Sequence, residues 1–225
     1  AFGKFLNAGQ TCVAPDYLLI KEELKDSFIE AIRDVIYEFF GENPIENKQL
    51  VKIINQKHFE RLSHLLENQD IVIGGKFDER HLKISPTVVD HVDGDNSLMQ
   101  EEIFGPILPI ITYHNIHEAI HFINQREKPL AFYIFSSQKE VQDLLLKSCS
   151  FGGGCINDTI IHLATSELGF GGVGHSGMGS YHGKKSFETF SHTRSIVKKA
   201  TWIDLPLRYY PYTPLKDKMI RLFVK

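Results

Sequence analysis

The sequence predicts an α/β fold in which a mainly parallel sheet carries helices on both faces. Short apolar runs alternate along the chain with longer segments whose apolar residues recur every three or four positions. Strands that alternate with helices in this way are typical of parallel sheets covered by helices. The 225 residues, 42% hydrophobic and 24% charged, suffice for a sizeable core and exclude disordered and collagen-like classes.

Four elements are expected to open the chain. In order, they are a helix over 1–8, a strand over 16–20, a helix over 22–40 and a second long helix over 48–68. The helix over 22–40 is the clearest, because its apolar residues follow helical spacing. Gly9 and Gly41 stand where two of these helices should end. Asn47 is placed to cap the second long helix.

The alternation of strands and helices continues through the second half. We expect strands over 71–73, 86–89 and 107–113, a helix over 116–125, a strand over 130–136, a helix over 138–148 and a strand over 154–157. Pro109 interrupts the third of these strands near its start. Residues 166–183 are rich in glycine, which predicts irregular backbone rather than a packed element.

Two further elements are expected near the C-terminus. Residues 195–202 are a candidate strand, and Thr213-Pro214 begins a tail helix. The helix carries an apolar stripe made of Leu215, Met219, Leu222 and Phe223. Because it is too short to be stable alone, this stripe must be buried against something. Docking onto the body, extension of a partner's sheet and weak attachment to an anionic membrane all fit the pattern.

The start of the chain predicts a cut inside a longer protein. Ala1 is not an initiator methionine, and helical spacing begins at Phe2 with nothing before it to cap the helix. A signal peptide is not indicated, because no charged region followed by an apolar run is present. Half of any active site could therefore lie upstream.

Charge and cysteine usage narrow the class of protein. The 25 basic and 28 acidic side chains are interspersed, so the sequence has no electrostatic footprint of a nucleic-acid binder. No apolar run approaches the roughly 20 residues of a membrane helix, and membrane association is not expected. The cysteines Cys12, Cys149 and Cys155 form no CxxC pair, which favours a reducing cytoplasm over a disulfide framework.

Cys12 is the strongest candidate for chemistry. It follows a predicted helix end and turn, which would leave its thiol accessible, as a nucleophilic cysteine requires. A small buried hydrophobe is the ordinary alternative for a free cysteine. No nearby histidine completes a Cys/His dyad, which disfavours a protease. Cys149 and Cys155 flank the start of a predicted strand and are expected to be core or half-buried thiols.

Three segments resemble motifs of the aldehyde dehydrogenases. Residues 5–12 consist of an aromatic, three residues, Gly-Gln, one residue and cysteine, which is similar to the active-site cysteine signature of that family. The continuation over 12–17 resembles the class 3 branch. Residues 101–106 resemble the family's cofactor motif, and residues 169–183 its late glycine-rich segment, again in class 3 form. The motifs occur in the family's order, and the resemblance runs from residue 1 to the C-terminus.

The resemblance implies oxidation of an aldehyde to a carboxylic acid with NAD or NADP. The Cys12 thiolate would form a thiohemiacetal, hydride would pass to the nicotinamide, and water would hydrolyse the thioester. The Cys12 N–H would help to hold the oxyanion. The family's general base, a Glu, its second oxyanion donor, an Asn, and its dinucleotide-binding domain would lie upstream of Ala1. The chain alone is therefore expected to be inactive.

The resemblance also implies roles for four further residues. Glu102 would accept hydrogen bonds from the ribose hydroxyls next to the nicotinamide, and Phe104 would pack near the nicotinamide. Asn157 and His162 would line the substrate pocket. Without the resemblance, Glu102 would be a solvated surface acid and Phe104 an ordinary core residue.

Two other patterns are set aside. Residues 172–177 match the string GxGxxG, but no predicted strand leads into it, so its glycines are expected to let backbone pass close to another segment. His117 and His121 are four residues apart on a predicted helix, yet no third ligand stands at a recognisable spacing. We therefore predict no metal site.

Two alternative functions remain open at this point. An acylating relative would pass the thioester to coenzyme A instead of water, and a non-catalytic assembly module would keep only the fold and the arm. The resemblance to class 3 enzymes implies a cysteine-bearing catalytic domain over 1–190 and an oligomerisation arm over 191–225. It favours a symmetric homodimer that binds a small aldehyde and is joined through this arm.

Overall fold

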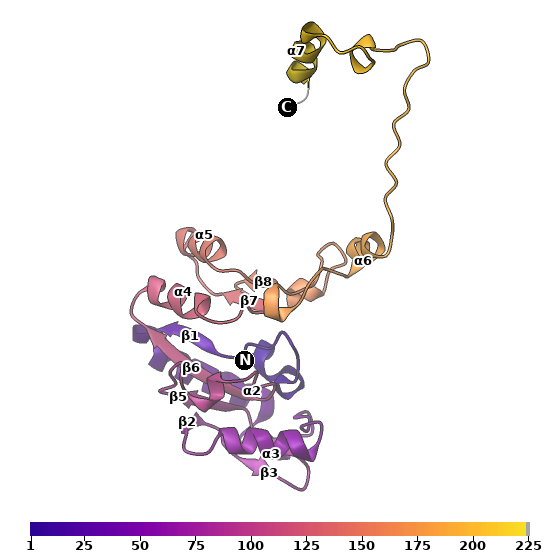
Figure 1. The fold of residues 1–225 in the computed structure, drawn as a ribbon. Helices are drawn as coiled ribbons and strands as arrows, with labels where there is room; N and C mark the ends of the chain where they lie inside the picture. The colour runs from indigo at the N-terminus through magenta and orange to yellow at the C-terminus, as the bar shows by residue number, and fades with distance from the viewer. Residues whose placement is uncertain (224–225) are drawn as a thin grey trace. The chain divides into compact units, whose positions relative to one another are not determined.

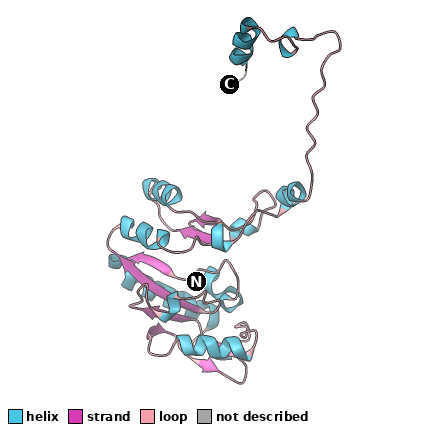
Figure 2. Ribbon diagram, in the orientation of Figure 1, coloured by secondary structure: helices cyan, strands magenta, loops and turns pink. Residues whose placement is uncertain are grey.

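A computed structural model describes residues 1–223 of the chain (Figures 1 and 2). The chain divides into two units, Ala1–Phe190 and a second that begins at Ser191. All the strands lie in the first unit, as the magenta arrows of Figure 2 show. Within the described residues, no helix has both the length and the apolar character needed to cross a membrane.

A four-stranded mixed sheet forms the centre of the first unit. In spatial order its strands are β1 (Leu18–Lys21), β6 (Ile107–Tyr113), β5 (Thr87–Asp90) and β2 (Asp70–Ile73). β6 is parallel to both of its neighbours, with Leu18 opposite Ile110 and Thr87 opposite Ile107. β2 is antiparallel to β5, so the sheet is mostly rather than wholly parallel. The predicted α/β class is confirmed.

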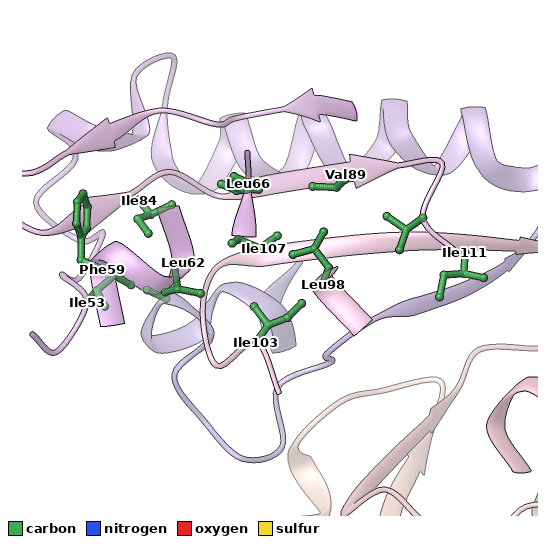
Figure 3. Packing of buried hydrophobic residues seen from close by; sticks show 12 residues of the cluster. Ile53, Phe59, Leu62, Leu66, Ile84, Val89, Leu98, Ile103, Ile107 and Ile111 are labelled. Atoms are coloured by element: carbon green, nitrogen blue, oxygen red, sulfur yellow. The ribbon is translucent and has the colours of Figure 1, made fainter. Parts of the chain in front are cut away.

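Each face of this sheet is covered by a helix, as predicted. On one face, the buried side chains are Ile29, Ile32 and Ile36 of α2 (Lys25–Phe40) and Val88, Leu108 and Ile110 of the sheet. On the other, they include Phe59 and Leu62 of α3 (Gln56–Leu65) and Val89, Ile107 and Ile111 of the sheet (Figure 3). The two sets alternate along β5 and β6, because successive side chains of a strand point to opposite faces.

The helix α3 is shorter than the predicted helix over 48–68. It begins at Gln56, where Asn55 rather than Asn47 accepts the capping hydrogen bond from His58 N–H. Leu50 and Ile53 had suggested helical spacing, but they are 2% and 0% exposed on irregular backbone. Their apolar character thus reflects burial alone, which short apolar runs do not distinguish from helical periodicity.

The N-terminal helix is also shorter than predicted. α1 covers only Phe2–Phe5, because Asn7, Ala8 and Gly9 adopt left-handed conformations with φ of 53°, 53° and 72°. Left-handed residues cannot continue a right-handed helix. The chain therefore turns away from the helix axis before it reaches Cys12.

A smaller parallel sheet packs beside β1. It consists of β7 (Ala131–Ile134) and β8 (Gly153–Ile156), and α4 (Ile116–Asn124) and α5 (Lys139–Ser148) cover it. Its core contains Ile123, Ile134, Leu145 and Cys149, and Leu19 of β1 packs against this cluster. These four elements agree with the predicted order. A short antiparallel pair, β3 (Phe77–Asp78) and β4 (Lys83–Ile84), was not predicted.

The glycine-rich segment is irregular, as predicted. An isolated bridge joins Phe170 to Tyr181, and a Cβ on Gly172 would lie 2.0 Å from the carbonyl oxygen of Ser176. Backbone therefore passes close to backbone there, which is the use we expected for these glycines. A short helix that was not predicted, α6 (Gly183–Thr189), follows.

The second unit contains the helix α7 (Pro214–Phe223). Its predicted continuation to Lys225 lies outside the described residues. The strand expected over 195–202 is not formed, since residues 191–200 have no ladder partner in the described chain. The stripe residues Leu215, Met219 and Leu222 are 69%, 39% and 73% exposed.

A buried ion pair joins α2 to the end of β5. Lys25 Nζ lies 2.7 Å from Asp90 Oδ2, and their side chains are 17% and 7% exposed. Burial alone would raise the pKa of Asp90, but hydrogen bonds from Lys25 Nζ and the His91 N–H hold it below its usual value. The charged form of Asp90 therefore stabilises the folded protein at neutral pH.

We expect Asp90→Asn to lower the free energy of unfolding by about 2 kcal/mol at pH 7, since a charge-assisted hydrogen bond is lost. A carboxylate with a depressed pKa contributes stability above its unfolded pKa of about 3.9 and loses it as pH falls further. The difference between wild type and variant should therefore shrink toward pH 3. Urea denaturation followed by circular dichroism measures both. Asp143→Asn, in an exposed pair with Lys139, is the control and should change little.

Candidate active site

Cys12 stands at the corner of a tight turn. The Ala14 N–H donates to the Thr11 carbonyl oxygen over 3.1 Å, which closes the turn, and the Cys12 side chain is exposed. The Cys12 N–H donates to no acceptor in the described part of the chain. An accessible thiol beside a free backbone donor is suited to attack on a carbonyl group, because the N–H can stabilise the oxyanion that forms.

Three consecutive left-handed residues lead into this turn. Asn7 and Ala8 both have a φ of 53°, which costs an L-residue other than glycine about 1–2 kcal/mol. The next residue, Gly9, lies against the backbone of Gly105, and a Cβ on Gly9 would be 2.2 Å from the Gly105 carbonyl oxygen. Only glycine fits at this position. The close approach also places the segment 101–105 directly beside the loop that carries Cys12.

Gln10 ties the cysteine loop to the segment before α3. Its Oε1 accepts from the Ile54 N–H over 2.9 Å, and its Nε2 donates to the carbonyl oxygens of Lys52 (3.2 Å) and Asn7 (3.0 Å). The Asn7 amide donates in return to the Gln10 carbonyl oxygen. One side chain thus satisfies three backbone groups, and the loop is fixed on the side facing residues 52–54.

Tyr133 of β7 holds the same loop from another direction. Its hydroxyl donates to the carbonyl oxygen of Val13, the residue after Cys12, over 2.7 Å. Burial raises the pKa of Tyr133 to about 12, so the hydroxyl remains a donor through the neutral range. The small parallel sheet is therefore linked to the candidate nucleophile by a hydrogen bond between residues 120 positions apart.

Glu102 and Phe104 project from the connection that leads into β6. Between them, Ile103 is 0% exposed and anchors the connection in the core (Figure 3). Phe104 is 41% exposed with a φ of 48°, so it is not the core residue that its type alone suggests. The Glu102 carboxylate is accessible and makes no hydrogen bond or ion pair to the described residues. Desolvation and the nearby Asp16 carboxylate raise its pKa.

Two charged side chains hold the backbone of Ile103. Asp16 Oδ1 accepts from the Ile103 N–H over 3.0 Å, and the Arg61 guanidinium donates to the Ile103 carbonyl oxygen. Arg61 also pairs with Glu101 Oε1 at 2.9 Å. The polar groups on both sides of the buried Ile103 are thus satisfied by opposite charges.

Lys4 is buried beside these groups. It is 2% exposed and forms no ion pair or hydrogen bond through its side chain with the described residues. Burial lowers its pKa to about 8, although the negative charges of Asp16 and Glu102 oppose the shift. Burial likewise raises the pKa of Asp16, and Lys4 opposes that change. The cysteine loop and the connection 101–105 therefore share one partly desolvated group of charges.

The two predicted pocket residues differ in their surroundings. The Asn157 amide both accepts from and donates to the backbone of Ser136, which joins the ends of β8 and β7. His162 lies against Tyr133 with ring centroids 6.0 Å apart, and its Nδ1 is 3.5 Å from Cys155 Sγ. Its Nε2 is buried without a partner among the described residues, and burial lowers its pKa. The structure thus places His162, but not the Asn157 amide, next to a residue that supports the cysteine loop.

The remaining cysteines and histidines show no second cluster. Cys149 is buried and Cys155 half-buried, as predicted, and both are free thiols. His117 and His121 lie on α4. Among residues 1–223, no group of three or more His, Cys, Asp or Glu side chains could hold a metal ion.

Sequence reasoning missed four residues that build this site. Gln10 was noted only as part of a motif, and Asp16, Arg61 and Tyr133 were not singled out. A signal was present for Asp16, since an acidic residue directly before an apolar strand needs a partner when it is buried. The contacts of Arg61 and Tyr133 span 42 and 120 residues, and nothing in the local pattern indicates them.

Comparisons with known proteins identify the family of the chain. The aldehyde dehydrogenase family profile matches residues 1–196. The chain is 50% identical to 4,4'-diaponeurosporen-aldehyde dehydrogenase of Staphylococcus aureus, covering 100% of the chain and 49% of that protein. It is 46% identical to the dimeric NADP-preferring aldehyde dehydrogenase of Rattus norvegicus (96% and 48% covered). It is 50% identical to aldehyde dehydrogenase family 3 member B1 of the same species (95% and 46% covered).

A solved structure shares the fold. The substrate-bound state of Staphylococcus aureus AldH matches with a TM-score of 0.93 and 50% identity, over 100% of this chain and 49% of that chain. The relatives confirm the class 3 resemblance. The chain spans about half the length of the curated relatives it matches.

Replacing Tyr133 by Phe should loosen the cysteine loop. The change leaves the carbonyl group of Val13, a 3% exposed residue, without its partner, and we expect the free energy of unfolding to fall by about 1–3 kcal/mol. Urea denaturation measures this loss. Tyr113→Phe is the matched control, because the half-buried Tyr113 hydroxyl has no hydrogen-bond partner among the described residues. Equal stability of Tyr133→Phe and wild type would show that the hydrogen bond does not hold the loop.

Proposed function

The chain belongs to the aldehyde dehydrogenase family, and we propose that the protein containing it oxidises an aldehyde to a carboxylic acid with NAD or NADP. The observation that carries this proposal is the exposed Cys12 thiol at a turn whose Cys12 N–H has no acceptor among the described residues. The rigid surroundings support it, since the loop is held by Gln10, Tyr133 and the contact of Gly9 with Gly105.

In the proposed reaction, the Cys12 thiolate adds to the aldehyde carbonyl carbon. A C–S bond forms, and the carbonyl oxygen becomes an oxyanion that accepts a hydrogen bond from the Cys12 N–H. Loss of hydride from the same carbon leaves a thioester on Cys12. Water then attacks the thioester, the carboxylic acid departs, and the thiol is restored. A general base and a second oxyanion donor are required, and we propose that residues outside this chain supply them, so that the chain alone is inactive.

The cofactor would be held in part by Glu102 and Phe104. The accessible Glu102 carboxylate has no protein partner among the described residues, so it is free to accept from the two hydroxyls of a ribose. Phe104 is 41% exposed and offers an aromatic face to a planar ring. These residues therefore fit a nicotinamide nucleotide, which when bound supplies the hydride acceptor. The preference for NAD or NADP would be set by contacts with the adenosine part of the cofactor.

The substrate pocket is proposed to lie on the side of Cys12 that faces Tyr133. His162 packs against the Tyr133 ring and has a buried Nε2 without a partner among the described residues. Asn157 contributes by fixing the strand ends from which this side is built. The three cysteines are free, which suits a reducing compartment, and we propose that the protein is cytoplasmic.

The arm is proposed to join two copies of the protein. Ile196, Val197 and Trp202 are 72%, 94% and 82% exposed, and the backbone over 191–200 has no ladder partner in the described chain. An extended segment with free backbone groups and apolar side chains can add to the edge of another sheet. One relative is itself named dimeric. A homodimer in which each arm reaches the other subunit would bury these side chains.

The nucleophile is tested in the full-length protein. We expect Cys12→Ser to lower aldehyde oxidation by at least about a thousandfold, because removal of a nucleophile removes the covalent route. Iodoacetamide should alkylate Cys12 before the buried Cys149, and Cys149→Ala should keep its activity. With coenzyme A present, the free acid should still accumulate. Substantial turnover by Cys12→Ser would refute the assignment, and acyl-coenzyme A as the product would favour the acylating alternative.

The arm is tested by truncation. Removal of residues 191–225 from the full-length protein should convert a dimer into a monomer, because the exposed apolar side chains would no longer be shared between subunits. Light scattering coupled to size-exclusion chromatography measures the mass. Removal of 214–225 alone separates the contribution of α7 from that of the extended segment. A full truncation that remains dimeric at micromolar concentration would exclude the arm as the joint.

A further inference from the structure

The backbone of Ile103 is a second point, besides the contact of Gly9 with Gly105, at which the cysteine loop and the proposed cofactor-binding connection are joined. Asp16 follows Cys12 on the same loop, and its Oδ1 accepts from the Ile103 N–H over 3.0 Å, across 87 residues of sequence. Ile103 stands between Glu102 and Phe104. A change in the position of this one amide therefore moves both proposed cofactor ligands.

The side chain of Ile103 alone does not determine that position. It is 0% exposed and packs in the cluster that includes Leu62 and Leu98 (Figure 3). The peptide groups of Ile103 can rotate while its apolar side chain stays buried, so burial does not fix the orientation of the N–H and C=O groups. Hydrogen bonds do fix it, because they are directional. The directional restraints are Asp16 on the N–H and Arg61 on the carbonyl oxygen.

Stability alone is a poor explanation for these charges. Asp16 and Lys4 are partly or fully desolvated, and such groups often contribute less to stability than apolar side chains of similar volume. Lys4 is 2% exposed and has no ion-pair partner among the described residues within 4.0 Å, so it balances the carboxylates of Asp16 and Glu102 only from a distance. A carboxylate kept in such a place must do something that an apolar residue could not do.

We propose that Asp16 is a positioning residue for the cofactor, which sets Glu102 and Phe104 relative to Cys12 through its hydrogen bond to Ile103. The inference rests on the proposed function, because it concerns the ligands of the nicotinamide nucleotide. Asp16 lies on the same loop as Cys12, so its hydrogen bond to Ile103 sets the position of the proposed cofactor ligands relative to Cys12.

The test uses Asp16→Ala and Asp16→Asn in the full-length protein. Asn keeps an oxygen that can accept from the Ile103 N–H, whereas Ala does not. We expect Asp16→Ala to weaken NAD(P) binding in calorimetry and to slow single-turnover formation of the reduced cofactor, each by at least tenfold. Alkylation of Cys12 by iodoacetamide should stay within twofold of wild type. Asp16→Asn should restore both cofactor readouts to within about fivefold.

Hydrogen exchange of the Ile103 amide gives a readout that needs no cofactor. Its protection should fall at least tenfold in Asp16→Ala and persist in Asp16→Asn. Lys4→Met combined with Asp16→Asn removes both charges, keeps the acceptor, and should behave like Asp16→Asn. Asp34→Asn, an exposed aspartate on α2, is the matched control and should change none of these values.

Three outcomes would overturn the proposal. Asp16→Ala could leave Ile103 exchange and cofactor affinity unchanged, or it could slow Cys12 alkylation as much as hydride transfer, which would indicate general loosening. If Asp16→Ala does not fold, failure of Asp16→Asn to keep the Ile103 protection also refutes it. A wild-type protein that binds no NAD(P) and reduces none would instead refute the proposed function, while the exchange experiment would still decide whether Asp16 holds Ile103.

Discussion

The close passage of Gly9 along the Gly105 carbonyl group is the constraint on which the candidate active site depends. A Cβ on Gly9 would lie 2.2 Å from that oxygen, and a Cβ on Gly105 would lie 2.5 Å from Leu62 Cδ2. Both loops are thus in backbone contact with no side chain between them. The left-handed Asn7 and Ala8 bring the chain into this contact, and the turn at Cys12 follows from it. Gln10 and Tyr133 then need only hold a loop whose path is already determined by sterics.

The sheet explains why these two loops meet. β1 and β6 are parallel neighbours, so the segments that lead into them arrive at the same edge. The Cys12 loop precedes β1, and the connection 101–105 precedes β6. Open α/β sheets usually bind ligands at the carboxyl ends of their strands. Here the two segments lie at the amino ends of their strands, so the candidate active site is at an edge that the general rule would not have selected.

The sequence predicted the parts of this architecture that depend on local periodicity. The helix α2 and the strand β6 follow from residue spacing, and both appear where they were expected. Leu50 and Ile53 misled the prediction, because burial on irregular backbone and burial on a helix select the same residue types. The motifs indicated Cys12, Glu102 and Phe104. What they could not indicate were the supports, since the contacts of Asp16 and Tyr133 span 87 and 120 residues and depend on the folded sheet.

Backbone strain and buried charge occur together beside Cys12, and each also occurs elsewhere in the fold, as at Leu82 and in the Lys25–Asp90 pair. Asn7, Ala8 and Phe104 have positive φ in the two loops that touch at Gly9, and Lys4 of α1 and Asp16 are desolvated beside them. Each feature makes the free energy of folding less favourable. Burial of the neighbouring apolar cluster, which contains Ile103 and Leu62, both 0% exposed, offsets that cost. A sequence selected for stability alone would have removed such features one at a time. Their presence beside one exposed thiol supports the proposal that this thiol and the neighbouring Glu102 carboxylate are kept in a set geometry.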